Sequence, residues 1–228
     1  TRWIKQWVGK EAYNILWKNL FIYKFYDYAN NLSAAWIWSR MRRIGTSRYS
    51  IFREKLGYLN GGSETLLKAM KSYIEKNGGE FRLSCPVLKV EISNLNVKGV
   101  HISNAFEDFD SVISTIPLTY VPKIMPDLPL DLLQKFSSVN NIAVVCVIVK
   151  LKRKLTNNFW LNINDDDMDI PGLVEYTNLR PLDNHIVYVP FYMPGTHPKY
   201  SDSDQVFLEK VKKYLKKINN KLRDDDFI

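Results

Sequence analysis

Apolar residues recur at helical spacing in five stretches of the chain. The first covers residues 1–20, where aromatic and aliphatic side chains fall on one face and Gly9 interrupts the pattern, so two short helices are expected there. A second helix over 34–43 begins after Asn31 or Ser33, either of which can cap it, and ends at 45–47. Further helices are predicted over 64–76, which stops at Asn77-Gly78-Gly79, and over 130–136 and 204–218.

Alternating or continuous apolar runs predict strands elsewhere. Four short strands are expected at 81–83, 87–92, 97–102 and 111–115, with a hairpin loop at 94–96. The run 142–151 predicts a central strand, followed by strands at 159–163, 173–177 and 185–192. In the segment 159–163 the alternation predicts a buried Trp160. Helices and antiparallel strands in separate runs indicate an α+β fold.

Composition indicates a folded chain without a membrane span. Of 228 residues, 46% are hydrophobic and 25% charged, which excludes a disordered segment. The longest apolar run, 142–149, is too short to cross a bilayer, and no signal peptide is seen. Cys85 and Cys146 both lie in apolar stretches and are interpreted as reduced core residues of a cytoplasmic protein. The chain begins at Thr1 inside a predicted helix, so we expect a piece of something longer.

Positive charge is concentrated in the first half. Residues 1–100 contain 17 Lys+Arg and 7 Asp+Glu, a net +10, whereas residues 101–228 have a net charge of −2. Such a front half could attract nucleic acid, an anionic membrane surface or a phosphate-bearing ligand, or it could be an ordinary solvated surface. The clustered arginines of this half are Arg40, Arg42, Arg43, Arg48 and Arg53.

The familiar short catalytic and metal-binding motifs are missing from these residues. The sequence has no G-x-G-x-x-G turn, no phosphate-binding P-loop and no G-x-S-x-G nucleophile elbow. The histidines at 101, 185 and 197 lack the spacing of metal ligands, and the acidic run 165–169 lacks the glycine and glutamate of a calcium loop. No metal is therefore expected, and no catalytic residue is assigned.

Several motifs in order resemble the FAD-dependent amine oxidoreductase family, which includes monoamine oxidases, protoporphyrinogen oxidases and phytoene desaturases. The segment Gly57–Ser63, the helix after it, Asn77-Gly78-Gly79 and the strand starting at Val87 follow the family pattern. So does Ser114-Thr115-Ile116-Pro117, which matches the family's small-Thr-x-Pro turn. The stretches 34–40 and 176–179 are similar to the bacterial, cell-envelope-associated branch of this group.

This resemblance implies an interleaved domain organisation and an FAD site. Residues 1–50 and 139–220 would form the substrate-binding region that roofs the flavin, residues 51–138 part of the FAD-binding domain, and residues 221–228 a tail. The family's backbone contact to adenine corresponds to Val87, and Thr115 and Pro117 would lie close to the cofactor. The family's phosphate-binding glycine turn is absent, so FAD is expected in a complete parent protein and is not expected to stay with this chain alone.

The resemblance also implies an oxidoreductase acting on a small-molecule substrate. Hydride transfer to a flavin needs no protein nucleophile, which agrees with the missing triad. The substrate-contacting candidates are Trp38, Arg40, Asn162, Glu175, Asn178 and Tyr188. The alternative is a non-catalytic binding or scaffold module that recognises an anionic polymer or a partner protein. Because Arg42 lies about 100° round the helix from Arg43, we expect no specific nucleic-acid binding.

Overall fold

The computed structural model describes residues 1–50, 53–54, 57–103 and 105–228, with residues 49, 53 and 54 described by backbone alone. The chain divides into unit 1, which is Thr1–Glu54 with Asn141–Ile228, and unit 2, which is Lys55–Asn140. The fold is α+β, as predicted, with helices beside antiparallel sheets of three and four strands. Within the described ranges, no helix is long and apolar enough to span a membrane.

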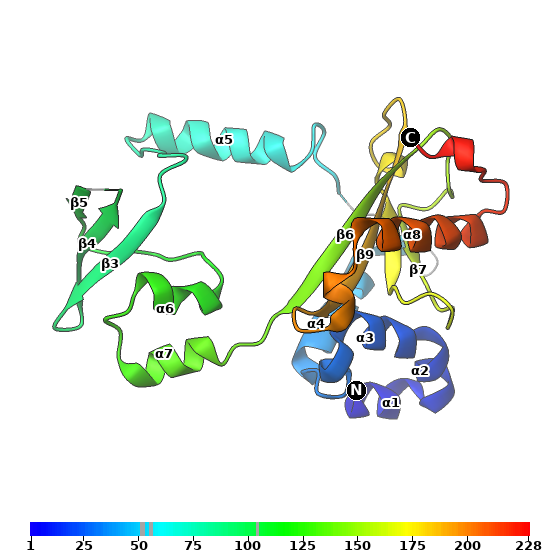
Figure 1. Cartoon of the computed structure of the whole chain (residues 1–228), viewed down its shortest axis with the longest axis horizontal. Coiled ribbons are helices and arrows are strands. Elements are labelled where there is room, and N and C mark those ends of the chain that lie inside the picture. Colours follow the sequence, from blue (N-terminus) through cyan, green and yellow to red (C-terminus); the bar gives the residue numbers. More distant parts are fainter. Residues whose placement is uncertain (51–52, 55–56, 104) are drawn as a thin grey trace. The chain divides into compact units, whose positions relative to one another are not determined.

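Unit 1 begins with short helices that gather at one end of its sheet (Figure 1). Gly9, at φ 83°, ends the first helix as predicted, whereas the second break at Trp17 has no glycine or proline signal. Ser33 caps the fourth helix, its hydroxyl accepting from the backbone N–H of Trp36 at 3.4 Å. The helices of this unit are α1 (Arg2–Val8), α2 (Lys10–Leu16), α3 (Lys18–Phe25), α4 (Ala34–Thr46) and α8 (Asp204–Ile218), with short 3₁₀ turns at Tyr26–Asn30, Tyr176–Asn178, Pro198–Ser201 and Asp224–Asp226.

The unit 1 sheet has the strand order β6-β9-β8-β7. Its strands are β6 (Ile142–Leu151), β7 (Trp160–Asn162), β8 (Gly172–Glu175) and β9 (His185–Pro194), and a separate two-stranded ribbon joins β1 (Arg48–Ser50) to β2 (Arg53–Glu54). The prediction that 142–151 is a central strand is wrong in position, because β6 is an edge strand and β9 lies inside the sheet. β6 pairs with β9 along all ten of its residues, which accounts for its strong strand pattern.

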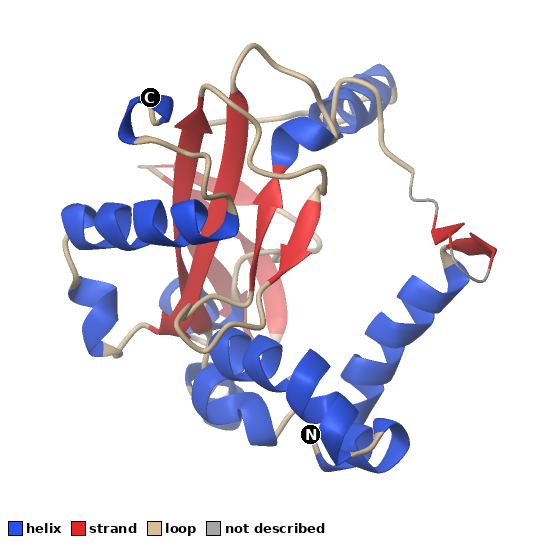
Figure 2. Ribbon diagram, turned by 90° about the vertical axis from the view of Figure 1, so that its right-hand side faces the viewer, coloured by secondary structure: helices blue, strands red, loops and turns tan. Residues whose placement is uncertain are grey.

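One face of this sheet forms the larger hydrophobic cluster of unit 1, and a second cluster lies among the N-terminal helices. Val187, Val189, Phe191 and Met193 alternate along β9 and pack with buried residues of α8, including Val211. Figures 1 and 2 show α8 packed across the strands of the sheet. Alternation on a pleated strand sends the intervening side chains to the opposite face. The apolar side of the amphipathic α8 therefore determines which face of the sheet is buried.

The core predictions for Cys146 and Trp160 are wrong because both residues lie on that opposite face, and Cys146 is exposed. Cys85, in unit 2, is only half-buried. Trp160 is 42% exposed, with Leu161 carrying the inward position of β7. The alternation predicted for 159–163 does occur in β7, but the face that α8 covers is the one carrying the odd-numbered residues of β6 and β7.

The last eight residues, expected to form a tail, are held against the end of β6. Asp226 is buried and pairs with Arg153, with its Oδ1 2.8 Å from Nε. The backbone of Asp226 accepts from Lys152, and Phe227 forms a bridge with Leu151 at the end of β6. One of the three consecutive aspartates is thus buried, and its ion pair with the half-exposed Arg153 anchors the segment.

Unit 2 contains a three-stranded sheet and three helices. Its elements are α5 (Ser63–Lys76), β3 (Val87–Ser93), β4 (Asn96–Ile102), β5 (Ala105–Asp108), the 3₁₀ turn Leu118–Tyr120, α6 (Val121–Ile124) and α7 (Leu130–Ser137). The sheet order is β3-β4-β5. The predicted hairpin is confirmed, with Asn94 and Leu95 both at positive φ in the two-residue loop. The predicted α5 and α7 also form where expected.

Two predicted strands of unit 2 are wrong. Residues 81–83 run into a turn in which Ser84 has a φ of 56°, and Arg82 forms ion pairs with Glu80 and Glu107. Residues 111–115 are irregular, and Ile113 is 91% exposed. A strand needs a neighbouring strand to accept its backbone hydrogen bonds, and neither segment has one among the described residues.

Unit 2 buries few apolar side chains of its own. Its buried hydrophobic residues are Val90, Val100 and Val121, as far as the described residues show. The apolar face predicted for α5 forms, but Leu67, Met70 and Ile74 on it remain exposed. A small apolar core of this kind stabilises a unit weakly, since burial contributes in proportion to the area removed from water.

Candidate functional site

The sheet face opposite α8 is the part of unit 1 that carries exposed aromatic and polar side chains. We call it the open face, and its residues on β6, β7 and β9 are Val144, Cys146, Ile148, Trp160, Asn162, Tyr188 and Tyr192. The strand register places Trp160 opposite Val174, Val174 opposite Tyr188, and Tyr188 opposite Ile148, which makes one continuous row across the sheet. An uncovered row of this kind can stack against a flat ligand.

Two of the predicted substrate residues, Asn162 and Tyr188, lie on the open face. Asn162 accepts a hydrogen bond from the indole Nε1 of Trp160, with 2.6 Å between Nε1 and Oδ1. Tyr188 packs edge-on against Tyr176, with 6.0 Å between the ring centroids. Trp160 was not among the predicted site residues because alternation alone suggested that it was buried.

Gly172 leaves room for the backbone of β7. It lies opposite Asn162 in the register, and a Cβ placed on it would come 3.4 Å from the indole and 2.6 Å from the carbonyl oxygen of Leu161. A glycine is therefore needed here for a close approach between β7 and β8.

Glu175 does not reach the open face. Its side chain is fully buried, and its carboxylate accepts from the backbone N–H of Leu155 at 2.9 Å, from that of Thr156 at 2.7 Å and from the Thr156 hydroxyl at 3.0 Å. These bonds satisfy a buried charge and hold the loop that follows β6. The structure gives Glu175 an internal role in place of the expected substrate contact.

Asn178 also holds the loop that follows β6. Its Nδ2 donates to the carbonyl oxygens of Thr156 at 3.1 Å and Asn158 at 2.8 Å. Its Oδ1 is buried and has no partner within the described part of the chain. Asn178 and Glu175 therefore hold the same loop. Neither of them lies beside Asn162 on the open face.

Trp38 and Arg40, the remaining candidates, are exposed on α4. The Arg40 guanidinium lies 5.1 Å from the centre of the Trp36 ring, and Arg42 lies 5.2 Å from that of Trp38. Of the predicted arginine cluster, Arg48 lies on β1, and the Arg53 side chain is outside the described residues. The cluster is therefore divided among several elements.

Sequence reasoning missed Lys24. This half-buried residue of α3 places its Nζ 5.6 Å from the centre of the Tyr192 ring, where α3 packs against β9. Burial lowers the pKa of Lys24, and the positive charges of Arg40 and Arg43 lower it further. A single lysine inside the aromatic run 23–26 is the sequence signal that could have pointed to it.

The predicted FAD contacts belong to unit 2. Val87 begins β3, which is an edge strand of its sheet and is irregular between Val87 and Lys89. The backbone groups on the outer side of β3 have no strand partner among the described residues, so they remain available to a ligand. Thr115 and Pro117 are exposed in the irregular segment before the Leu118–Tyr120 turn.

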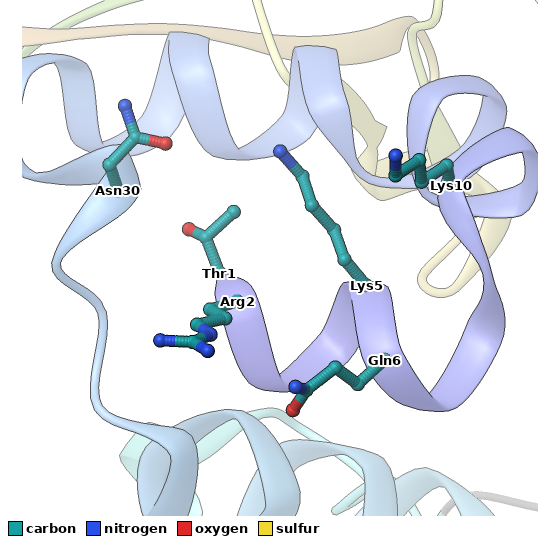
Figure 3. A pocket seen from close by; sticks show the side chains of 6 residues that line it. All are labelled: Thr1, Arg2, Lys5, Gln6, Lys10 and Asn30. Atoms are coloured by element: carbon teal, nitrogen blue, oxygen red, sulfur yellow. The ribbon is translucent and has the colours of Figure 1, made fainter.

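A surface hollow lies elsewhere on unit 1. The hollow, about 440 Å³, is lined by Thr1, Arg2, Lys5, Gln6, Lys10 and Asn30 (Figure 3). It contains none of the predicted site residues. In the residues that the structure covers, no group of three or more His, Cys, Asp or Glu is placed to hold a metal ion.

Comparison with solved structures supports the fold. An oxidoreductase from Methanosarcina mazei matches with a TM-score of 0.70 and 18% identity over 97% of this chain and 53% of its own. A reduced UDP-galactopyranose mutase matches with a TM-score of 0.66 and 15% identity, over 99% and 53%. A candidate protoporphyrinogen oxidase from Exiguobacterium sp. 255-15 matches at 0.56 and 20%, over 73% and 38%. The chain therefore spans about half the length of the first two proteins and 38% of the length of the third.

The family assignment comes from sequence. A search of curated proteins finds no significant match. The family model described as flavin containing amine oxidoreductase, however, matches residues 10–227, which is nearly the whole chain and includes both units. The chain belongs to the flavin-containing amine oxidoreductase family.

Proposed function

We propose that this chain supplies the substrate region and part of the FAD site of a flavin-dependent oxidoreductase that acts on a small molecule. The open face carries the proposal: it is a sheet surface with exposed Trp160 and half-buried Tyr188 and Tyr192, while the other face of the same sheet is filled by the core. Isolated apolar residues are common on protein surfaces, but a continuous row of them on one sheet face is typical of a binding surface.

The residues of unit 1 fit the task of roofing a flat ring. The Trp160–Asn162 hydrogen bond fixes the indole against the sheet, and Gly172 lets the backbones of β7 and β8 approach closely. An aromatic roof excludes water from the reacting centre. The chemistry that a bound FAD would supply there is acceptance of a hydride from a substrate C–H bond.

The residues of unit 2 fit the adenine end of FAD. The outer edge of β3 at Val87 offers backbone N–H and C=O groups, and an edge of this kind recognises a base without any particular side chain. These 228 residues contain no G-x-G-x-x-G turn to hold the diphosphate. We therefore propose that firm FAD binding needs residues outside this sequence.

The proposal is tested by comparing flavin binding in two proteins. The first is the 228-residue chain, and the second is the product extended at both ends by the flanking coding sequence. After purification, absorbance should show stoichiometric flavin in the extended protein and none in the shorter chain. An extended protein that binds no flavin would overturn the proposal, and stoichiometric flavin in the shorter chain would overturn the stated need for outside residues.

A pair of variants tests the role of the β3 edge in the extended protein. Val87→Pro removes the backbone N–H, whereas Val87→Ala changes only the side chain. FAD affinity, measured by fluorescence titration, should fall in the proline variant and stay unchanged in the alanine variant. Equal effects of the two substitutions would show that the side chain, and not the backbone, makes the contact.

A further inference from the structure

The hydrogen bond between Trp160 and Asn162 fixes the orientation of the Asn162 amide. An asparagine amide has an oxygen that accepts hydrogen bonds and an NH₂ group that donates them, whereas an indole N–H only donates. The contact of 2.6 Å from Nε1 of Trp160 therefore takes the oxygen of Asn162. Both hydrogens of Nδ2 remain for other partners, so the pair presents a hydrogen-bond donor on the open face.

The neighbours of Asn162 in the sheet do not use this donor. Because β7 is an edge strand, one side of Asn162 has no adjacent strand in the sheet. On the other side the residue opposite Asn162 is Gly172, which has no side chain. No side chain of β6, β7, β8 or β9, all of which the structure describes, accepts a hydrogen bond from Nδ2.

The donor adjoins a broad apolar row. Trp160 is 42% exposed and Ile148 is 61% exposed, and they lie at the two ends of the row that includes Val174 and Tyr188. The row crosses four strands, which is about 14 Å, and Asn162 lies about 7 Å along β7 from Trp160. A flat ring system on this row brings its edge within reach of the Asn162 amide.

The strand positions of the open face carry little charge. Lys150, near the end of β6, is the charged residue among them, and the others are aromatic, aliphatic, thiol or amide side chains. Lys24 contacts the ring of Tyr192, four residues along β9 from Tyr188, which is about 13 Å. A charged group placed over the Trp160–Tyr188 row would lose hydration without an ionic partner, so the row favours an uncharged ligand.

We propose that Nδ2 of Asn162 donates a hydrogen bond to an uncharged carbonyl oxygen of a flat, apolar molecule that lies on the row. Trp160 has two roles in this arrangement, because its ring supports the ligand and its N–H orients the amide. That the molecule is the substrate, or the flavin ring itself, rests on the proposed function. The preference for a carbonyl oxygen does not, because both residues belong to unit 1 and need no flavin.

The test is calorimetric titration of the 228-residue chain with two probes of the same shape. 2-Acetylnaphthalene has a carbonyl oxygen where 2-isopropenylnaphthalene has a CH₂ group, and the measured quantity is the ratio of their dissociation constants. Asn162→Leu should shift this ratio against the ketone about fivefold, the usual net contribution of one neutral hydrogen bond. Asn14→Leu makes the same change at an exposed asparagine of α2 and should leave the ratio unchanged.

Two further variants separate the donor from the residue that orients it. Asn162→Asp keeps an oxygen for the indole but replaces the NH₂ group with a second oxygen, so the ketone should lose at least as much as in Asn162→Leu. It is nearly isosteric and decides the matter if circular dichroism shows that Asn162→Leu fails to fold. Trp160→Phe keeps a ring but leaves the amide free to turn, so the preference for the ketone should fall to an intermediate value.

An unchanged ratio in both Asn162 variants would overturn the proposal, and so would the failure of both probes to bind. A ratio in Trp160→Phe equal to that of the unmodified chain would remove the orienting role of the indole. Naphthalene-2-carboxylate that bound more tightly than the ketone would contradict an uncharged ligand. Light scattering tests for a second copy of the chain, and a dimer that dissociates in Trp160→Ala would make the open face a protein interface and overturn the proposal.

Lumiflavin, the flavin ring without its ribityl phosphate chain, distinguishes the two sources of the carbonyl oxygen. If the flavin ring lies on the row, Asn162→Leu should lower both lumiflavin affinity and the FAD content of the extended protein. If the substrate lies there, both should stay unchanged while the preference for the ketone is lost.

These outcomes are separate from those of the flavin experiment. A preference for the ketone together with an extended protein that binds no flavin would leave the Asn162 contact standing and remove the oxidoreductase role. Flavin binding without any preference for the ketone would do the reverse.

Discussion

The indole Nε1 of Trp160 donates to Oδ1 of Asn162 at 2.6 Å, and the two residues occupy alternate positions of one strand. A side chain two residues away on a strand lies on the same face, so the bond holds the ring along β7 and leaves its flat surface uncovered. The consequence is a rigid aromatic surface outside the core, in a chain whose family handles a flat cofactor.

Trp160→Ala should have little effect on stability. Because the side chain is 42% exposed, we expect a loss of about 1 kcal/mol in the free energy of unfolding. Phe191→Ala, on the buried face of β9 in the same sheet, should lose about 3–5 kcal/mol and serves as the matched control. Urea melts of both variants make the comparison. A loss for Trp160→Ala as large as that for Phe191→Ala would contradict the open face.

Glu175→Ala should be strongly destabilising. The substitution leaves two backbone N–H groups, those of Leu155 and Thr156, without their acceptor inside the protein. Buried hydrogen bonds to a charged group contribute about 1.5–3 kcal/mol each, so the expected loss is about 3 kcal/mol or more. Glu175→Gln keeps one acceptor oxygen and should lose less. If both variants melted like the unmodified chain, the loop would not depend on Glu175.

The Asp169 network should make unfolding sensitive to acid. Burial alone would raise the pKa of Asp169, but hydrogen bonds from Lys199 and Tyr214, with Lys210 nearby, bring it below its usual value. A carboxyl with a lowered folded-state pKa stabilises the fold above its unfolded pKa of about 3.9, and that contribution is lost as the pH falls through the folded value.

Asp169→Asn should therefore reduce stability at neutral pH and flatten its decline below about pH 4. Thermal melts between about pH 3 and 7 measure both effects. Asp225→Asn is a suitable control, since Asp225 is exposed in the C-terminal 3₁₀ turn. An unchanged acid decline in Asp169→Asn would show that other carboxylates carry it.

Oligonucleotide binding should be weak and non-specific. Each phosphate neutralised on duplex DNA contributes about −0.9 to the slope of log affinity against log salt, so three α4 arginines acting together would give about −3. Only Arg40 and Arg43 share a side of the helix, and we expect a shallower slope. Fluorescence anisotropy at about 150 mM salt, repeated with Arg42→Glu/Arg43→Glu, is the measurement. Sub-micromolar affinity that this double variant abolishes would favour the binding-module alternative.

Local features could be predicted from the sequence because short-range interactions determine them. The Gly9 break, the Ser33 cap and the Asn94–Leu95 hairpin each depend on the backbone preferences of a few adjacent residues. The family motifs around Gly61 and Val87 were recognised for a similar reason, since they follow a fixed order along the chain.

Tertiary structure alone decided which side of each element is buried and which charges meet. Alternation places Trp160 and Cys146 on one face of the sheet, but whether that face is covered depends on where α8, more than forty residues further along, docks. Arg153 and Asp226 are likewise ordinary charged residues until the C-terminal segment folds back beside β6 and brings them together. In the sequence Glu175 is only an acidic residue in a predicted strand. The fold buries its carboxylate against the backbone N–H groups of Leu155 and Thr156. Burial and electrostatics act through space, and the distances that govern them exist only in the folded chain.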